Sequence, residues 1–460
     1  MRKQLIMVLA VVALSGAATA CSSSGTSPAP SQAPTTAAST GVTPTVLPSA
    51  TAAAVTGDIT VLTNRTDIVD SVFVAKYVPE FQKLYPNVNV KFEALKNYDT
   101  DVPIRMNTTA YGDVLLIPNA IKPDQLASYF TPLGTITDLG KTYRRVTEQS
   151  FGDTVYGLPV VVNANGIVYN KKVWDAAGIT SLPKTPDEFV ADLKTVKAKN
   201  PTIIPYYTNY KDAWPLTQWQ SNTGEITADA NYSGSALWKD DAPWTAGKDQ
   251  YVVYKLLYDI VKGGLAERDP STTDWETSKG LLGSGKVSSM ALGSWAISQM
   301  QAAAVTAGGV ATDISYMPFP YQVNGKFVSN IGGDWKMAVN KNSKNQAAAL
   351  AWLYWFENSS GFSFDQGGIN PVLAGKNAPQ YADFDKAGVQ YLEQAPAVPG
   401  SQAYLGQIQD KSKIQLFGSD WVARIVDSAR GSSKETLDQI FTDLNTKWKA
   451  ARAALKIPSA

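Results

Sequence analysis

Residues 156–190 constrain the fold of this chain more tightly than any other segment. They open with an apolar run at 156–162 that Gly157 and Pro159 bend, followed by the sequence Asn-Ala-Asn-Gly. A second short apolar run at 167–169 comes after this interruption. Short apolar runs bounded by Gly, Pro and Asn are typical of buried strands. The pattern therefore predicts an interrupted, extended crossing of the chain before its next helix.

Two helices with marked ends are expected next. Asn170 can cap a brief helix over 171–177, and Gly178 then stands where a helix end favours positive φ. The sequence Thr-Pro-Asp-Glu at 185–188 combines a capping box with proline at the first helical position. Apolar residues on one face continue this second helix until an Asn-Pro pair at 200–201 stops it. Periodicity by itself predicts a strand followed by two helices.

The same segment also resembles a known family. It carries, in order, a Gly-x-Pro sequence, a Tyr-Asn-Lys tripeptide, Ala-Gly-Ile, and Pro-x-Thr-x-x-Glu-Phe. This ordered series is similar to the extracellular solute-binding proteins of ABC importers, and most similar to the carbohydrate-binding type that includes maltose-binding protein. The resemblance implies two Rossmann-like α/β lobes joined by a hinge, with the ligand in the cleft between them. Residues 156–190 would then carry the chain from the first lobe into the second.

The residues before this segment fit an α/β lobe. Alternating or continuous apolar residues predict strands at 58–63, 88–92 and 114–117. Helical stretches lie between them, and Pro79 should kink or break the first. Strand–helix–strand–helix–strand is the pattern of a doubly wound α/β fold.

Later motifs continue the resemblance. A strand ending in a Gly-x-Trp turn is expected at 288–300, and 330–340 should return the chain to the first lobe. An apolar helix follows at 347–356, and an amphipathic helical region at 421–448 is expected in the second lobe. We hypothesise a first lobe of about 58–160 and 334–384, and a second of about 165–329 and 390–460.

The N-terminal sequence predicts a signal for export and membrane anchoring. Arg2 and Lys3 precede an apolar run at 5–14 that is too short to span a membrane, and small residues lead to Cys21, the only cysteine. This resembles a bacterial lipobox, which implies a signal peptide at 1–20 and a lipidated Cys21. An ordinary signal peptide beside a chance cysteine is the alternative. Residues 22–57 contain no charged residue and are expected to form a disordered tether that holds the domain at the outer face of the cell membrane.

Charge and composition exclude several classes of function. The chain has 41 basic and 40 acidic residues, and loss of Arg2 and Lys3 with the signal leaves 39 against 40. This balance disfavours a nucleic-acid partner. The absence of histidine excludes Ser–His–Asp triads and His-bearing zinc sites, so we expect neither a metal nor another cofactor. A carboxylate pair, a lysine or a tyrosine could still serve an enzyme.

Aromatic residues outside apolar runs are the strongest candidates for a sugar site. Sugar rings present C–H faces to flat aromatic surfaces, and hydroxyl edges to planar polar groups. Trp295 ends a predicted strand in Gly-Ser-Trp, and the resemblance implies that it stacks on sugar; filling the core is the alternative. The other candidates are Gly333, Asp334 and Trp335 in a Gly-Gly-Asp-Trp sequence, Trp214 before a proline, and Trp421, each with an ordinary structural role as its alternative.

Polar candidates follow the first and third predicted strands. The resemblance implies hydroxyl contacts for Asn64, Arg65 and Asp67, although a helix N-cap in this loop is an equal alternative. Asn119 could contact the ligand after the third strand. Asn163 stands where some relatives have an acidic residue, so a contact that needs a carboxylate is in doubt there.

We therefore expect a monomeric, lipid-anchored receptor that captures a sugar and passes it to the permease of an ABC importer, without catalysis. The same fold could instead bind a peptide or a polyamine. A secreted glycosidase would use the same aromatic residues together with two carboxylates. A cell-wall adhesion module is disfavoured because no repeat or basic patch is visible.

Overall fold

Buried apolar side chains divide the described chain into two lobes. The computed structural model describes residues 52–398 and 400–458, so the predicted signal peptide, Cys21 and most of the predicted tether lie outside the described residues. The core of the first lobe draws on residues from 52 to 161 and from 337 to 362. The core of the second lobe draws on residues from 162 to 331 and from 369 to 457. The chain therefore passes between the two cores three times.

The first lobe is built on a five-stranded sheet in the order β2-β1-β3-β13-β7. β1 pairs in parallel with β2 and β3, as the sequence predicts, whereas β13 is antiparallel to β3 and β7. A small three-stranded sheet, β4-β6-β5, completes the strands of this lobe. The bounds are β1 Gly57–Thr63, β2 Val88–Ala94, β3 Val114–Leu116, β4 Gly134–Thr135, β5 Ser150–Phe151, β6 Thr154–Val155, β7 Leu158–Pro159 and β13 Lys336–Val339.

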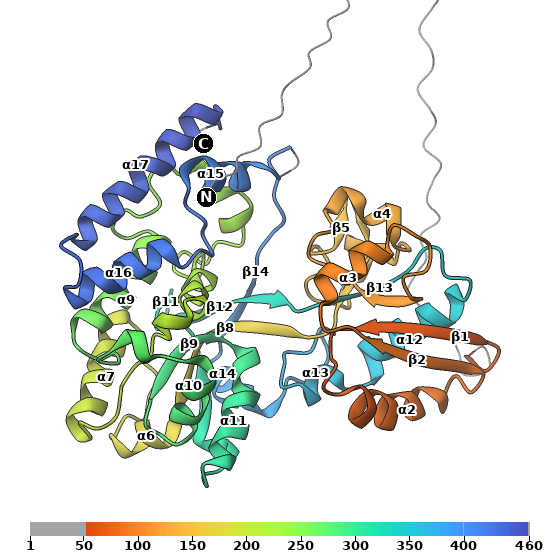
Figure 1. Cartoon of the computed structure of the whole chain (residues 1–460), viewed down its shortest axis with the longest axis horizontal. Coiled ribbons are helices and arrows are strands. Elements are labelled where there is room, and N and C mark those ends of the chain that lie inside the picture. The colour runs from red at the N-terminus through yellow and green to blue at the C-terminus, as the bar shows by residue number, and fades with distance from the viewer. Residues whose placement is uncertain (1–51, 399, 459–460) are drawn as a thin grey trace, which may run out of the picture. The chain divides into compact units, whose positions relative to one another are not determined.

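Helices cover the first sheet, and Figure 1 shows α2 and α12 beside β1 and β2. The predicted first helix consists of two helix types. A π-helix spans Val69–Tyr77, and the α-helix α2 follows directly at Val78–Gln82, with Pro79 in its first turn. The helical segment is uninterrupted from Val69 to Gln82, so the break expected at Pro79 is absent and the proline lies just after a change of helix type. The remaining helices are α3 Tyr98–Arg105, α4 Leu126–Tyr129, α5 Ile136–Leu139, α12 Gln346–Ser359 and α13 Phe362–Asp365.

The second lobe is organised around the long strand β8, which pairs with β9, β10 and β12. Alternate β8 side chains point to opposite faces of the sheet: Ile167 and Tyr169 enter one core cluster, and Ala164 and Val168 enter the other. Figure 1 shows β8 and β12 side by side. The bounds are β8 Val162–Asn170, β9 Ser289–Gly293, β10 Ile314–Met317, β11 Gln322–Val323, β12 Lys326–Gly333 and β14 Gln390–Glu393.

The helix ends predicted after β8 are present. The Asn170 side chain accepts from Val173 N–H at the start of α6, and Gly178 has φ +83°. Thr185 caps α7 by accepting from Glu188 N–H, but the Glu188 carboxylate accepts from Lys184 N–H, so the capping box is shifted by one residue. The helices of this lobe are α6 Lys171–Ala176, α7 Pro186–Lys199, α8 Leu237–Lys239, α9 Asp249–Lys262, α10 Trp275–Gly283, α11 Ile297–Thr306, α14 Ala382–Lys386, α15 Tyr404–Ser412, α16 Asp420–Arg430 and α17 Leu437–Leu455.

One expected boundary is wrong. We expected the first lobe to extend to about residue 384, but Tyr381 and Phe384 belong to the core of the second lobe. Phe384 stacks on Tyr316 of β10 with ring centroids 5.2 Å apart. The chain has already crossed back between Phe362 and Ile369. Sequence motifs gave no sign of this third crossing because no strand marks it.

Candidate functional site

A cavity of about 390 Å³ lies where segments of both lobes meet. The ends of β1 and β3 form its first-lobe side, and the turn from β9 into α11 forms its second-lobe side. Open α/β sheets place their ligand crevice at the carboxyl ends of parallel strands, and the cavity has this position. Its polar residues and two half-buried indoles are Thr63, Asn64, Arg65, Asp67, Asn163, Trp295, Ser298, Gln299, Asp334, Trp335 and Gln366. The rest of the lining is apolar and includes Phe73, Phe92, Trp352, Phe356 and Phe362.

Trp295 forms the second-lobe wall of the cavity. It lies in a single helical turn, Ser294–Ala296, directly after β9, and its side chain is half-buried. The indole folds back over the end of the strand: an ideal Cβ at Gly293 would lie 2.4 Å from its Nε1. Only glycine leaves room for this side-chain position.

Trp335, in the connection between β12 and β13, is a second indole of the cavity lining. Its half-buried ring packs edge-on against Tyr98 with centroids 5.3 Å apart. The Tyr98 hydroxyl donates to Leu116 O at 3.0 Å and accepts from Leu116 N–H at 2.8 Å. Tyr98 is therefore fixed to the end of β3, and it fixes Trp335 in turn.

Arg65 organises the polar side of the cavity. Its Nε and Nη2 donate to the two carboxylate oxygens of Asp67, each at 2.8 Å. Its Nη1 donates to Gln366 Oε1 at 2.6 Å, which joins the loop after β1 to the segment after α13. The hydrogen bonds from Arg65 lower the pKa of Asp67, so this carboxylate is ionised at neutral pH.

Asp334 supplies a second carboxylate. Its backbone N–H donates to Val161 O at 2.8 Å, which ties two of the chain crossings together. Its side chain is accessible from the cavity but is flanked by protein, and this partial desolvation raises its pKa.

Asn163 is held by the turn that carries Trp295. Ser294 Oγ donates to Asn163 Oδ1 at 3.3 Å and accepts from Ala164 N–H at 2.9 Å. The Tyr381 hydroxyl donates to the same Oγ. The crossing strand and the Trp295 turn therefore form one hydrogen-bonded unit.

Seven of the predicted contact residues line this cavity, and four do not. Asn119 pairs with Asp99 instead, through its backbone N–H at 2.9 Å and its amide at 2.8 Å. Gly333 donates its N–H to Glu148 Oε1 at 3.1 Å, and so belongs to the hinge region. Trp214 lies beside Trp295, with ring centroids 5.8 Å apart, but outside the cavity.

The structure corrects the prediction for Trp421. This residue is the second in α16, is only 6% exposed and packs against Tyr254 with centroids 4.4 Å apart. Its indole N–H donates to Gln415 O at 2.9 Å. Trp421 lies on the apolar face of the amphipathic helix α16, and this face packs into the core. The preceding Ser-Asp had instead indicated a loop position.

Four polar residues of the lining were not predicted from the sequence: Thr63, Ser298, Gln299 and Gln366. Ser298 and Gln299 are exposed in the first turn of α11, and their spacing from Trp295 could have revealed them. Gln366 accepts a hydrogen bond from Arg65, which lies 301 positions away in the sequence, and no local sequence pattern predicts this contact. Trp275, the first residue of α10, lies beside Trp295 with ring centroids 5.8 Å apart, and no local pattern indicates this contact.

The arrangement is suited to holding a neutral, polar ligand with apolar faces. Two indoles offer flat surfaces, and amide, carboxylate and guanidinium groups line the same cavity. Among residues 52–398 and 400–458, no group of three or more His, Cys, Asp or Glu side chains is placed to hold a metal ion.

Comparisons with known proteins agree with this geometry. The profile of the family described as bacterial extracellular solute-binding protein matches residues 65–361. This chain belongs to that family. It is similar to BlMnBP1, a binding protein of an ABC transporter from Bifidobacterium animalis subsp. lactis solved in complex with mannobiose. The two are 33% identical with a TM-score of 0.74, over 88% of this chain and 96% of that one.

Two further relatives are similar to the chain. One is BlMnBP2 of the same organism, a manno-oligosaccharide specific solute binding protein solved with mannotriose; it is 33% identical with a TM-score of 0.73, over 88% of this chain and 97% of that one. The other is the diacetylchitobiose binding protein DasA of Streptomyces coelicolor, 27% identical over 205 residues. That match covers 44% of this chain and 45% of DasA, less than half of either.

These comparisons confirm the family resemblance and the two-lobed α/β fold inferred from the sequence. Within the part of the chain that the structure describes, no helix is both long and apolar enough to cross a membrane.

Proposed function

We propose that this protein captures a sugar or oligosaccharide between its lobes and delivers it to the permease of an ABC importer. The observation that carries the proposal is the cavity itself, whose lining combines Trp295 of the second lobe and Trp335 with polar side chains. Stacking on two indoles would fix the faces of a sugar ring. The polar groups would bind its hydroxyls and disfavour ligands that leave them unpaired.

Manno-oligosaccharides are the first ligands to test. The two structural relatives at 33% identity were solved with mannobiose and mannotriose. A polyamine would need several available carboxylates, but Asp67, one of the two carboxylates in the lining, is already paired with Arg65. The same pairing disfavours a glycosidase, which needs both carboxylates for proton transfer and nucleophilic attack.

The proposed location rests on the N-terminal sequence. Cys21 would carry the lipid anchor, and residues 22–57 would tether the two-lobed domain at the outer face of the cell membrane. The lobes would close over the ligand about the three chain crossings, and the closed, monomeric form would dock on the permease. Labelling with a radioactive fatty acid, with Cys21→Ala as the control, tests the anchor.

A thermal-shift screen tests the ligand class. The protein is heated with mannose, mannobiose, mannotriose, other sugars, amino acids and polyamines. A ligand that binds only the folded state at a hundredfold excess over its Kd adds roughly 2.7 kcal/mol of stability. We expect a sugar to raise the Tm. A shift with only a polyamine or a peptide would overturn the sugar assignment and leave the family assignment intact.

A further inference from the structure

One carboxylate holds both ends of the segment that carries Asp334 and Trp335. Glu148 Oε1 accepts from Gly333 N–H at 3.1 Å, and Glu148 Oε2 forms an ion pair with Lys336 Nζ at 2.8 Å. Lys336 Nζ also donates to Gly333 O at 2.8 Å, which links the two ends directly. The two residues between these ends line the cavity, whereas Glu148, Gly333 and Lys336 do not.

This segment has little freedom to move away from the carboxylate. A Cβ at Gly333 would lie 2.5 Å from Glu148 Oε2 and 2.8 Å from Pro159 Cβ, so only glycine fits between them. A backbone bond ties the segment to the first chain crossing, since Val160 N–H donates to Trp335 O at 2.9 Å. The position of Trp335 therefore depends on how the segment packs against Glu148.

Arg145 joins Glu148 to the second lobe. Its Nε donates to Glu148 Oε1 at 2.7 Å, and the two side chains are only 8% and 17% exposed. Its backbone N–H donates to Glu393 Oε2 at 3.0 Å at the end of β14, and its Nη1 donates to Gln394 O at 3.1 Å. Arg145 itself adjoins Val146 of the first-lobe core. A displacement of β14 relative to the first lobe would therefore reach Glu148 through Arg145.

The backbone of Arg145 is strained, with φ of +58°. This region is unfavourable for a residue with a Cβ, and such strain persists only where the surrounding structure holds it. Here the holding contacts come from both lobes and from the crossing between them. With Lys336 on the other side of Glu148, the side chains alternate in charge, and each cation depends on the same carboxylate.

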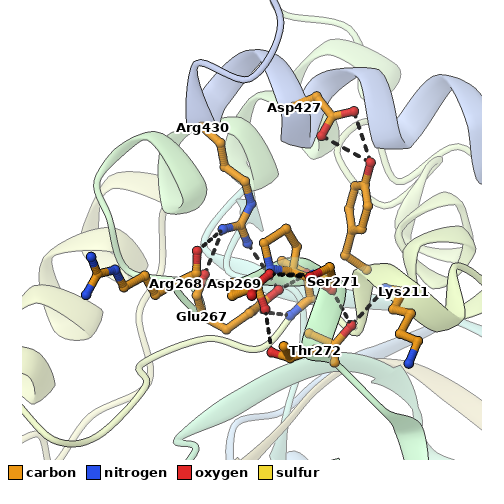
Figure 2. Close-up of polar contacts among 12 residues, drawn as sticks. Lys211, Glu267, Arg268, Asp269, Ser271, Thr272, Asp427 and Arg430 are labelled. Atoms are coloured by element: carbon orange, nitrogen blue, oxygen red, sulfur yellow. Dashed lines mark hydrogen bonds and ion pairs between the residues drawn. The ribbon is translucent and has the colours of Figure 1, made fainter.

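A second ion pair offers a comparison, and Figure 2 shows it. Arg430 Nη2 lies 3.1 Å from Glu267 Oε1, with the side chains 14% and 4% exposed, and Arg430 Nη1 donates to Glu267 O at 2.8 Å. Both residues belong to the second lobe, and neither lines the cavity. This pair resembles Arg145 and Glu148 in chemistry and burial, but it does not join the lobes.

We propose that Glu148 is a positioning residue for sugar binding, which holds Asp334 and Trp335 in place, and that Arg145 ties their position to the second lobe. Glu148 itself would not touch the ligand. Without its carboxylate, the segment would lose its fixed position, and the ligand would have to order it on binding, which lowers affinity. This inference rests on the proposed sugar-binding function.

Titration calorimetry with mannotriose tests the positioning role. Glu148→Ala should weaken binding roughly tenfold, because Asp334 and Trp335 are no longer held in place. In a Trp335→Ala background the same substitution should weaken binding by clearly less, because part of its effect passes through the indole that is now missing. Arg430→Ala is the matched control, and it should lower the Tm and leave the Kd unchanged.

Lys336→Met keeps the test available if Glu148→Ala does not fold. It retains the apolar stem of the lysine and leaves Glu148 paired with Arg145, but it releases one end of the segment. We expect it to weaken mannotriose binding by about threefold, again less in the Trp335→Ala background.

The outcomes separate this role from the proposed function. If the wild-type protein binds mannotriose and neither Glu148→Ala nor Lys336→Met changes its Kd, the positioning role is overturned and the proposed function stands. Equal losses in the wild-type and Trp335→Ala backgrounds also overturn it, as does an equal loss in Arg430→Ala. If the wild-type protein binds no sugar in the thermal-shift screen, the proposed function fails, and the positioning role fails with it.

Discussion

Gly293 allows the Trp295 indole to occupy its position at the cavity wall, because glycine has no side chain there. A Cβ at this position would lie 2.4 Å from Nε1 and 2.6 Å from Cδ1 of Trp295. We predict that Gly293→Ala displaces the indole and weakens sugar binding roughly tenfold, equivalent to about 1.4 kcal/mol. Because φ at Gly293 is −64°, the alanine meets no backbone strain. Titration calorimetry measures the change.

Gly280→Ala is the control for this substitution. Gly280 lies inside α10, and no atom lies within 4 Å of an ideal Cβ there. Alanine in a helix interior stabilises it by roughly 0.5–1 kcal/mol, so this variant should keep its affinity and gain a little stability. Equal sugar affinity in Gly293→Ala and the wild-type protein would contradict the role given to Gly293.

A second residue, Glu357 of α12, makes the stability of the first lobe depend on pH. Its side chain is buried, Oε1 has no hydrogen-bond partner, and burial raises its pKa well above the ordinary value of 4.5. The folded protein therefore binds a proton that the unfolded chain releases, and stability falls as pH rises above about 4.5. We predict that Glu357→Gln raises the Tm by about 2 °C at pH 7 and has little effect near pH 4.

Thermal unfolding at several pH values tests this prediction. The difference in Tm between Glu357→Gln and the wild-type protein should grow with pH. A difference that is constant from pH 4 to pH 7 would show that Glu357 does not change protonation on folding.

Among the elements, α6 illustrates how one side chain joins two helices. Asn170 Oδ1 accepts from Val173 N–H at 3.1 Å, and its Nδ2 donates to Leu282 O in α10 at 2.8 Å. Asn170 is 2% exposed, so alanine would leave buried groups without partners. We predict that Asn170→Ala lowers the free energy of unfolding by about 2 kcal/mol, and that Thr185→Ala, which removes only the cap of α7, lowers it by about 1 kcal/mol.

Urea unfolding of both variants measures the two losses. The comparison is matched because each substitution removes an N-cap in the same lobe, and only Asn170 carries the additional bond to α10. A loss at Thr185 equal to or larger than the loss at Asn170 would contradict the role given to that bond.

Elements with strong local signals were predictable from the sequence. The strands around β1, β2 and β3 and the caps of α6 and α7 follow from periodicity and capping residues. The π-helical form of Val69–Tyr77 did not follow, because no local pattern distinguishes it from an α-helix. Trp421 was misjudged for a related reason: its neighbours resemble a loop, whereas the helix after them buries its ring.

In the whole molecule, contacts across the chain crossings decide the site, and these were the least predictable features. Arg145, at φ +58°, donates its N–H to Glu393 and its Nη1 to Gln394 O. Its Nε donates to Glu148, which also accepts from Gly333 N–H. The loop of the first lobe is thereby joined to β14, to the residue after it and to the last residue of β12. Residues so distant in sequence share no local pattern from which their contact could be predicted. The contact between Gln366 and Arg65 was unpredictable for the same reason.

In the proposed complex, one sugar is held by side chains from both lobes. Titration calorimetry with mannotriose on the wild-type protein, Trp295→Ala and Trp335→Ala tests it most directly. We predict that each substitution weakens binding by at least about tenfold, because each removes one stacking face. If the wild-type protein binds mannotriose and neither substitution changes its Kd, the ligand lies elsewhere and the cavity between Trp295 and Trp335 is not the binding site.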